Sequence, residues 1–396
     1  MEKNKKEFEL LYEKEIIIEK KNLKNIRELH QNNQSFLLIH TQISKGLAAL
    51  MLLYHHLLRP GNKLNSSIKN EMIIFGIDLR RYISVFFKIT TCSYTFLSGI
   101  GIYYSLIKFK SIKDMYKKCL KNFFRLMIVF WIILIIVFPK GLQTGLFKLD
   151  FTTIIYCIFA DYYRKGNWWY VRMHFALLIY SPLFIKLFQD SDYKRKIFSF
   201  MVFYFFYFSI KIIQISFEFK GMINIFFHYF SYFSNIEIIL SFLSGIISAK
   251  YNLMEIFNNN KIESIYYSLF SIFSAVFIRC NLIYNEASTK IDFFIVPLFI
   301  MPIASLVSKN KILSDILSLF GKHSTNFWFL HGYFYDNFYL SILTLPKYSN
   351  LCYIWLVIMT LISSYIINLI LVPILNYINL RNFNYKGYFH FIYKNK

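Results

Sequence analysis

The stretch Lys45-Gly-Leu-Ala-Ala-Leu-Met-Leu-Leu-Tyr-His55-His56 places a cation and two adjacent histidines inside a membrane-length apolar segment. Ionisable side chains in such a segment lose hydration, so they are candidates for functional sites. On a helix, the eleven residues from Lys45 to His56 correspond to about 16 Å along the axis and a rotation of only about 20°. His55 points about 100° away from His56. The alignment favours His56 as the chemical histidine, and a histidine pair at a membrane interface is the structural alternative.

The composition indicates a membrane protein of several spans. Of the 396 residues, 56% are hydrophobic and only 17% are charged. The formal net charge of +23 comes largely from cations in the links between apolar runs, which is how topology determinants are distributed. We therefore expect membrane lipids, and no nucleic acid, as partners. The five cysteines are scattered, so neither a disulfide framework nor a metal site is predicted.

The apolar runs predict an all-α polytopic membrane bundle of about ten transmembrane helices. Basic residues are more frequent in the links on the side of the N-terminus, so both termini are expected in the cytoplasm. A shorter re-entrant segment is an option near residues 151–160. The expected spans are 36–58, 82–105, 123–139, 168–188, 197–217, 225–248, 264–284, 291–308, 325–345 and 352–378.

Three regions follow from the same patterns. Residues 1–35 form a charged arm without the apolar core of a signal peptide, and we expect this arm in the cytoplasm. Residues 36–380 form the membrane domain, and residues 381–396 form a basic cytoplasmic tail. Any activity is therefore expected to reside in the membrane bundle.

Five motifs in order resemble one family. Lys45-Gly46-Leu-Ala with His56 is similar to the first-helix signature of the acyltransferase 3 family of membrane O-acyltransferases, where an Arg is usual at position 45. Lysine keeps the charge but loses the planar, bidentate grip of arginine. The later motifs are Phe96-Leu-Ser-Gly99, the basic run of residues 117–125 with Asn122 where the family often has a further basic residue, Asn167-Trp-Trp-Tyr-Val-Arg172, and Phe320-Gly-Lys-His-Ser324 with His331.

The resemblance implies an enzyme that moves an acyl group, commonly acetyl, from a cytoplasmic acyl-CoA donor to a hydroxyl of an envelope polysaccharide or lipid-linked glycan. It implies a multi-pass protein of a bacterial inner membrane. Histidine is suited to take the hydroxyl proton near neutral pH, so His56 is expected to act as general base, or as a transient acyl carrier in a two-step reaction. Lys45 and Arg125 are expected to bind the donor phosphates. A positive-inside role is the alternative for Arg125.

Further candidate site residues carry structural alternatives. Ser98 suits close helix approach, Tyr170 suits an interfacial belt or sugar stacking, and a satisfied structural histidine is the alternative for His331. Glu237 is the acidic residue expected to neutralise an intramembrane cation. The complete set of secondary candidates is His55, Ser98, Tyr170, Arg172 and His331.

A different class of function is transport of a glycan or an anionic substrate by a flippase or permease. Intramembrane cations facing a cavity would serve such a substrate. We find no inverted repeat between the two halves of the chain, and a flippase does not need His56 at a fixed distance from a cation. A glycan polymerase is less favoured because no outer link is long. The acceptor, the acyl group and the oligomeric state do not follow from the sequence.

Overall fold

The structure is a computed structural model of the chain. A first helix covers residues 38–58, with Lys45 and His56 inside it as predicted. The predicted N-terminal arm, the C-terminal tail and the span at 197–217 lie outside the described residues. The described ranges are 38–59, 68–160, 168–189, 236–258, 262–282, 290–335 and 339–378.

The described chain is mostly helical, which confirms the predicted all-α class apart from a small hairpin. The hairpin pairs β1 (Ile73–Ile74) with β2 (Ile77–Asp78), and one 3-10 turn, η2 (Phe87–Ile89), joins α2 to α3. The helices are α2 (Leu79–Phe86), α3 (Thr90–Leu106), α4 (Ile112–Gln143), α5 (Phe151–Ile158), α6 (Trp169–Gln189), α9 (Ile236–Lys250), α10 (Glu255–Asn258), α11 (Ile262–Asn281), α13 (Asp292–Ser308), α14 (Lys311–Tyr335), α15 (Leu340–Leu343) and α16 (Ser349–Tyr377).

Five segments of the described chain are long and apolar enough to cross a membrane: the continuous run from α2 through α3, and α4, α6, α11 and α16. This finding supports a multi-pass membrane protein. The count of ten spans and the cytoplasmic position of both termini stay predictions. Near residues 151–160 the structure has a short helix, α5, whose first turn is capped by Asp150.

The ninth expected span was misplaced. We predicted residues 325–345, but α14 begins at Lys311 and ends at Tyr335. No proline interrupts the chain from Lys311 to Gly321, so the helix continues through this partly exposed first half before it enters the core. The charges of this half lower its mean hydropathy, and for that reason the apolar pattern alone did not include it.

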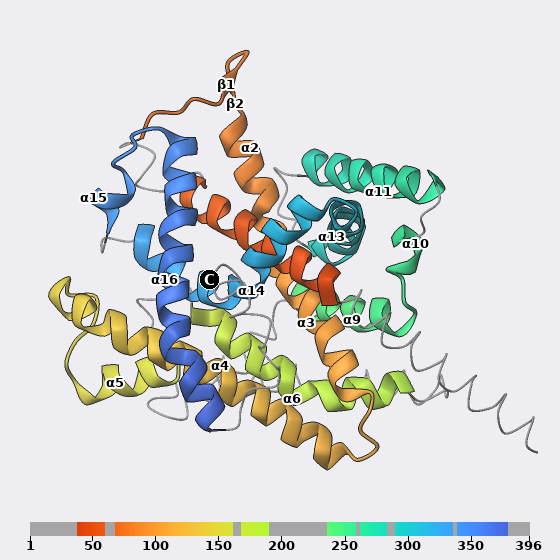
Figure 1. The fold of residues 1–396 in the computed structure, drawn as a ribbon, viewed down its shortest axis with the longest axis horizontal. Helices are drawn as coiled ribbons and strands as arrows, with labels where there is room; N and C mark the ends of the chain where they lie inside the picture. Colours follow the sequence, from red (N-terminus) through yellow and green to blue (C-terminus); the bar gives the residue numbers. More distant parts are fainter. Residues whose placement is uncertain are drawn as a thin grey trace, which may run out of the picture.

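The first helix, drawn in red and orange in Figure 1, crosses α14 in the middle of the bundle. A side chain at Gly46 would collide with the Leu317 carbonyl of α14, and a side chain at Gly321 would collide with the Gln42 carbonyl of the first helix. Glycine at both positions therefore permits contact between the two backbones. This contact fixes the first helix against the helix that carries His331.

A second close contact joins α3 to α9. A side chain at Gly99 would collide with the Phe242 carbonyl, and one at Gly245 would collide with the Phe96 carbonyl. Gly99 belongs to the predicted Phe-Leu-Ser-Gly motif, so the expectation that this motif permits close helix approach is met at the glycine. Around these contacts, α4, α6 and α16 lie on one side of the first helix, and α11 and α13 lie on the other (Figure 1).

Candidate active site

A pair of histidines lies where the first helix meets α14. The ring centroids of His56 and His331 are 5.0 Å apart, and His331 is only 1% exposed. Tyr335, one turn after His331, stacks on His56 with a centroid distance of 5.9 Å and an interplanar angle of 5°. The sequence named both histidines as candidates, and the structure brings them together.

Backbone contacts set the tautomers of the neighbouring rings. His331 Nδ1 lies 2.9 Å from the Phe327 carbonyl oxygen, and His55 Nδ1 lies 2.6 Å from the Ser84 carbonyl oxygen. A carbonyl only accepts hydrogen bonds, so each Nδ1 carries the proton and, in the neutral ring, Nε2 is the basic atom. For His331 this arrangement leaves a proton-accepting nitrogen on a buried ring beside His56.

His55 has a different role from His56. The Ser84 hydroxyl returns a hydrogen bond of 3.2 Å to the His55 carbonyl, so two bonds clamp this turn of the first helix to α2. His55 therefore fixes its helix in place, and the choice of His56 as the chemical histidine stays a prediction.

A group of basic side chains lies further back along the first helix. Lys45 is within electrostatic reach of Arg125 on α4 and of His174 on α6. These two residues, both predicted to bind the donor, therefore influence each other electrostatically although Lys45 and Arg125 are 80 positions apart. Because the helices keep these like charges close together at half-buried positions, an anion is the chemical partner that would stabilise the group.

An aromatic wall of Tyr94, Tyr170 and Trp328 lies between the two sites. The Trp328 ring centroid is 4.3 Å from Tyr170 and 5.0 Å from Tyr94. At one end of the wall Tyr170 stacks on His174 at 6.0 Å, and at the other end Trp328 is 6.4 Å from His331. A continuous series of ring contacts thus connects the basic group to the histidine pair.

Of the predicted site residues, Tyr170 belongs to this wall and Ser98 lies against it. The Ser98 hydroxyl donates to the Tyr94 carbonyl at 2.8 Å and is also hydrogen-bonded to the Tyr170 side chain. Tyr170 is only 9% exposed, so it lies inside the bundle and does not form an interfacial belt. Arg172 is buried in the same helix, about 200° around the axis from Tyr170, and leaves the helix on a different side.

The sequence interpretation missed His174, Trp328, Tyr94 and Tyr335 as members of this region. Helical spacing contained a usable signal, because His174 follows Tyr170 by four residues and Tyr335 follows His331 by four. No role was predicted for His323, which belongs to a separate polar network. Its Nδ1 lies 2.7 Å from the Ser364 hydroxyl of α16.

The neutralisation of an intramembrane cation by Glu237 stays a prediction, but for Arg279 the close acidic partner is another residue. Arg279, at the end of α11, lies 3.2 Å from the Asp292 carboxylate at the start of α13, and both side chains are buried. Glu237 and Lys88 are within electrostatic reach of Asp292. The apolar pattern put Asp292 at the edge of a span, which concealed its burial. Within the described ranges, no cluster of three or more His, Cys, Asp or Glu side chains could hold a metal ion.

Apolar, membrane-length helices around the contact of His56 with His331 indicate a multi-pass membrane protein. Residues 42–376 match the family model described as an acyltransferase domain, that of acyltransferase 3. The chain therefore belongs to the acyltransferase 3 family and is a membrane acyltransferase, which confirms the resemblance of its motifs. No curated protein and no solved structure matches the chain.

Proposed function

We propose that the protein transfers an acyl group, in the first instance acetyl, from a cytoplasmic acyl-CoA to a hydroxyl of an envelope polysaccharide or lipid-linked glycan. The membrane would be the plasma membrane of a bacterial-type cell. The observation that supports the proposal is the histidine pair of His56 and His331, joined by an aromatic wall to the basic group of Lys45 and Arg125.

In the proposed reaction, the acceptor hydroxyl oxygen attacks the carbonyl carbon of the thioester. His56 takes the hydroxyl proton as the carbon–oxygen bond forms, and the carbon–sulfur bond then breaks. The proton passes to the departing thiolate, so the products are an ester and a free thiol. The buried, basic Nε2 of His331 supports the adjacent His56 by stabilising the imidazolium that forms during the transfer.

The distance along the first helix suits this donor. Lys45 and His56 are about 16 Å apart along the axis, which matches the extended reach of a donor held at its phosphates with its thioester at the histidine pair. Tyr170 and Trp328 would provide apolar surface for the arm between these two ends. Family membership favours this reaction over the transport alternative.

A purified-component assay tests the proposal. The protein in liposomes is supplied with acetyl-CoA and with glycolipid extracted from the envelope, and free thiol and glycan mass are followed together. We expect one thiol released for each acetyl group gained by the glycan. Thiol release without a mass gain would overturn the glycan acceptor, and the absence of both would overturn the proposed donor and acceptor together.

A further inference from the structure

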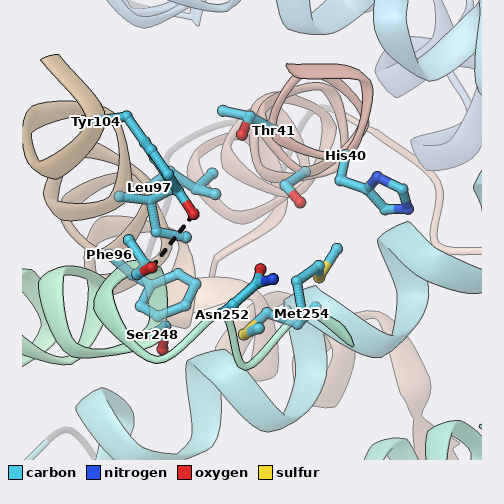
Figure 2. Close-up of a pocket in the computed structure, with 12 residues that line it drawn as sticks. His40, Thr41, Phe96, Leu97, Tyr104, Ser248, Asn252 and Met254 are labelled. Atoms are coloured by element: carbon cyan, nitrogen blue, oxygen red, sulfur yellow. Dashed lines mark hydrogen bonds between the residues drawn. The ribbon is translucent and has the colours of Figure 1, made fainter. Parts of the chain in front are cut away.

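The cavity drawn in Figure 2 is too small for an organic ligand. It lies between the first helix, α3 and the end of α9, and its room of about 20 Å³ is enough for one water molecule. Beside it, the Tyr104 hydroxyl donates to the Ala249 carbonyl at 3.2 Å and holds α3 against the end of α9. The cavity therefore belongs to the packing of these helices, and the outer surface of α4 offers more to a ligand.

The first turns of α4 carry an exposed apolar stripe. Its four side chains follow one another at intervals of four residues, so they share one face of the helix. Each of them is between 37% and 52% exposed. This part of α4 lies at the edge of the bundle, beside α6 (Figure 1). The stripe, which faces away from the protein, consists of Ile112, Tyr116, Leu120 and Phe124.

The length of α4 indicates that the stripe reaches the membrane surface. The helix has 32 residues and is therefore about 48 Å long, whereas the hydrocarbon core of a bilayer is about 30 Å thick. About 20 residues cross the core, and Lys140 marks the far end of the helix. Counted back from Pro139, the part that crosses the core begins near Leu120. Residues 112–119 then lie at the level of the lipid headgroups.

Lysines border the stripe at this level. Residues 108–121 contain six lysines and a single acidic residue, Asp114. Lys113 and Lys117 are exposed, and they lie about 60° and 100° around the helix from Tyr116, along one edge of the stripe. Asp114 approaches Lys117 to 3.7 Å, but both side chains are exposed, where such a pair contributes little. The edge of the stripe is therefore positively charged.

Further cations gather at the same end of the helix. Lys118 is within electrostatic reach of Lys108 and Lys121. These like charges repel one another, so an anion at the membrane surface would stabilise them. A soluble anion would contact only the cations, whereas an anionic lipid would contact both the cations and the apolar stripe beside them. The combination of the two surfaces favours a lipid.

We propose that the start of α4 binds an anionic phospholipid. Lys113 and Lys117 bind its phosphate, and its acyl chains lie along the apolar stripe. Lysine clusters beside a membrane helix are typical of such sites. Lys117 lies about two turns before Arg125 on the same helix, so the bound lipid also fixes the depth of Arg125 in the membrane. The inference does not depend on the reaction proposed above, and failure of one leaves the other standing.

Quenching by brominated lipids measures which lipid lies against the stripe. Leu120→Trp places a fluorescent reporter there, and the signal of the native tryptophans is measured in the parent protein and subtracted. The protein is reconstituted into mixed vesicles of phosphatidylcholine and phosphatidylglycerol, with one of the two lipids brominated on its chains. We expect phosphatidylglycerol to be favoured about tenfold at this reporter, as for attraction by one or two lysines near a membrane surface.

Removing the two charges tests the site itself. Lys113→Gln with Lys117→Gln should lower the preference to about twofold or less. The matched control is Lys309→Gln with Lys311→Gln, which removes two exposed charges at the start of α14 and should leave the preference unchanged.

Three results would overturn the proposal. The first is equal quenching by the two lipids in the protein with both lysines present. The second is a preference that survives the loss of Lys113 and Lys117, or that falls equally in the control, since the charge of the whole protein would then explain it. The third is weak quenching by both lipids, which would show that a second copy of the chain covers the stripe.

Discussion

The imidazole rings of His56 and His331 lie 5.0 Å apart, each ten residues beyond a glycine at which its helix touches the other. Gly46 lies against the backbone of α14, and Gly321 lies against the backbone of the first helix. Ten residues of helix are about 15 Å, so one close contact sets the relative height of both histidines. The motifs that contain these glycines and histidines therefore describe one structural unit.

Loss of either histidine should remove most of the activity. We expect His56→Ala and His331→Ala each to lower kcat by about 10²- to 10⁴-fold, the range for a positioned acid–base group. Since the two rings act as a unit, the double variant should be little worse than the more damaging single variant. Single-turnover acetyl transfer by purified protein measures both effects.

The control for this series is His323→Gln, which alters a buried histidine in the network with Ser364. Activity per folded molecule should stay near that of the wild type. Strictly multiplicative losses in the His56 and His331 double variant would contradict the shared role.

Gly46→Ala should destabilise the contact between the first helix and α14. The added methyl group meets the Leu317 carbonyl, and such overpacking costs about 1–3 kcal/mol. Gly101→Ala is the matched control because a methyl group there meets nothing within 4 Å, and it should raise stability by about 0.5–1 kcal/mol. Denaturation in detergent compares them. Equal effects of the two variants would rule out a specific contact at Gly46.

Lys45 should act mainly on the binding of the donor. We expect Lys45→Glu to raise KM for acetyl-CoA at least tenfold by placing a negative charge beside Arg125, where the donor phosphates would bind. Lys45→Arg keeps the charge and should stay within about threefold of the wild type. Initial rates over a range of donor concentrations separate KM from kcat. Unchanged donor affinity in Lys45→Glu would remove the phosphate role from this residue.

The buried pair of Arg279 and Asp292 should matter for stability. Asp292→Leu leaves the Arg279 charge without its close partner, and breaking a buried pair costs about 3–5 kcal/mol. Adding Arg279→Met should restore much of the loss, because neither charge then remains buried. Unfolding midpoints of the wild type and the two variants give the comparison. A double variant as unstable as the single one would show that Lys88 and Glu237, and not the pair of Arg279 and Asp292, determine the stability of this region.

The Asp150 cap of α5 lies outside the spans, and it should make the stability of the protein depend on pH. The Thr153 backbone N–H and hydroxyl donate to Asp150 at 2.7 and 2.8 Å, and these bonds lower the pKa of the Asp150 carboxyl. A lowered pKa in the folded state contributes stability above the unfolded value, and this contribution is lost as pH falls through the folded pKa. The stability difference between wild type and Asp150→Ala should therefore shrink below about pH 4. A difference independent of pH would contradict the cap.

Much of the bundle was predictable because hydropathy and helical period report directly on membrane burial. The first helix, α6, α11, α13 and α16 lie close to their expected positions. The placement of α14 failed because its first half carries charges while continuing the same hydrogen-bonded helix. Periodicity detects a burial pattern and not the end of a backbone helix.

The candidate site was predictable in its residues but not in its pairings. Helical spacing aligned Lys45 with His56, yet nothing in one sequence shows that Arg125 comes within electrostatic reach of Lys45 or that Asp292 meets Arg279. Such contacts depend on which helices are neighbours. The contact at Gly46 and Gly321 determines one of these neighbours. It can be recognised only when the backbones of both helices are known.

The acyl mass on envelope glycans tests the transferase role most directly. Glycans are purified from cells that produce wild-type protein, His56→Ala or His331→Ala at matched levels in the membrane, and are analysed by mass spectrometry. We predict an acyl increment with the wild type and its loss in both variants. An increment that persists in His56→Ala would contradict the assignment of His56 as the base, and identical spectra with and without the wild-type protein would contradict acyl transfer to these glycans.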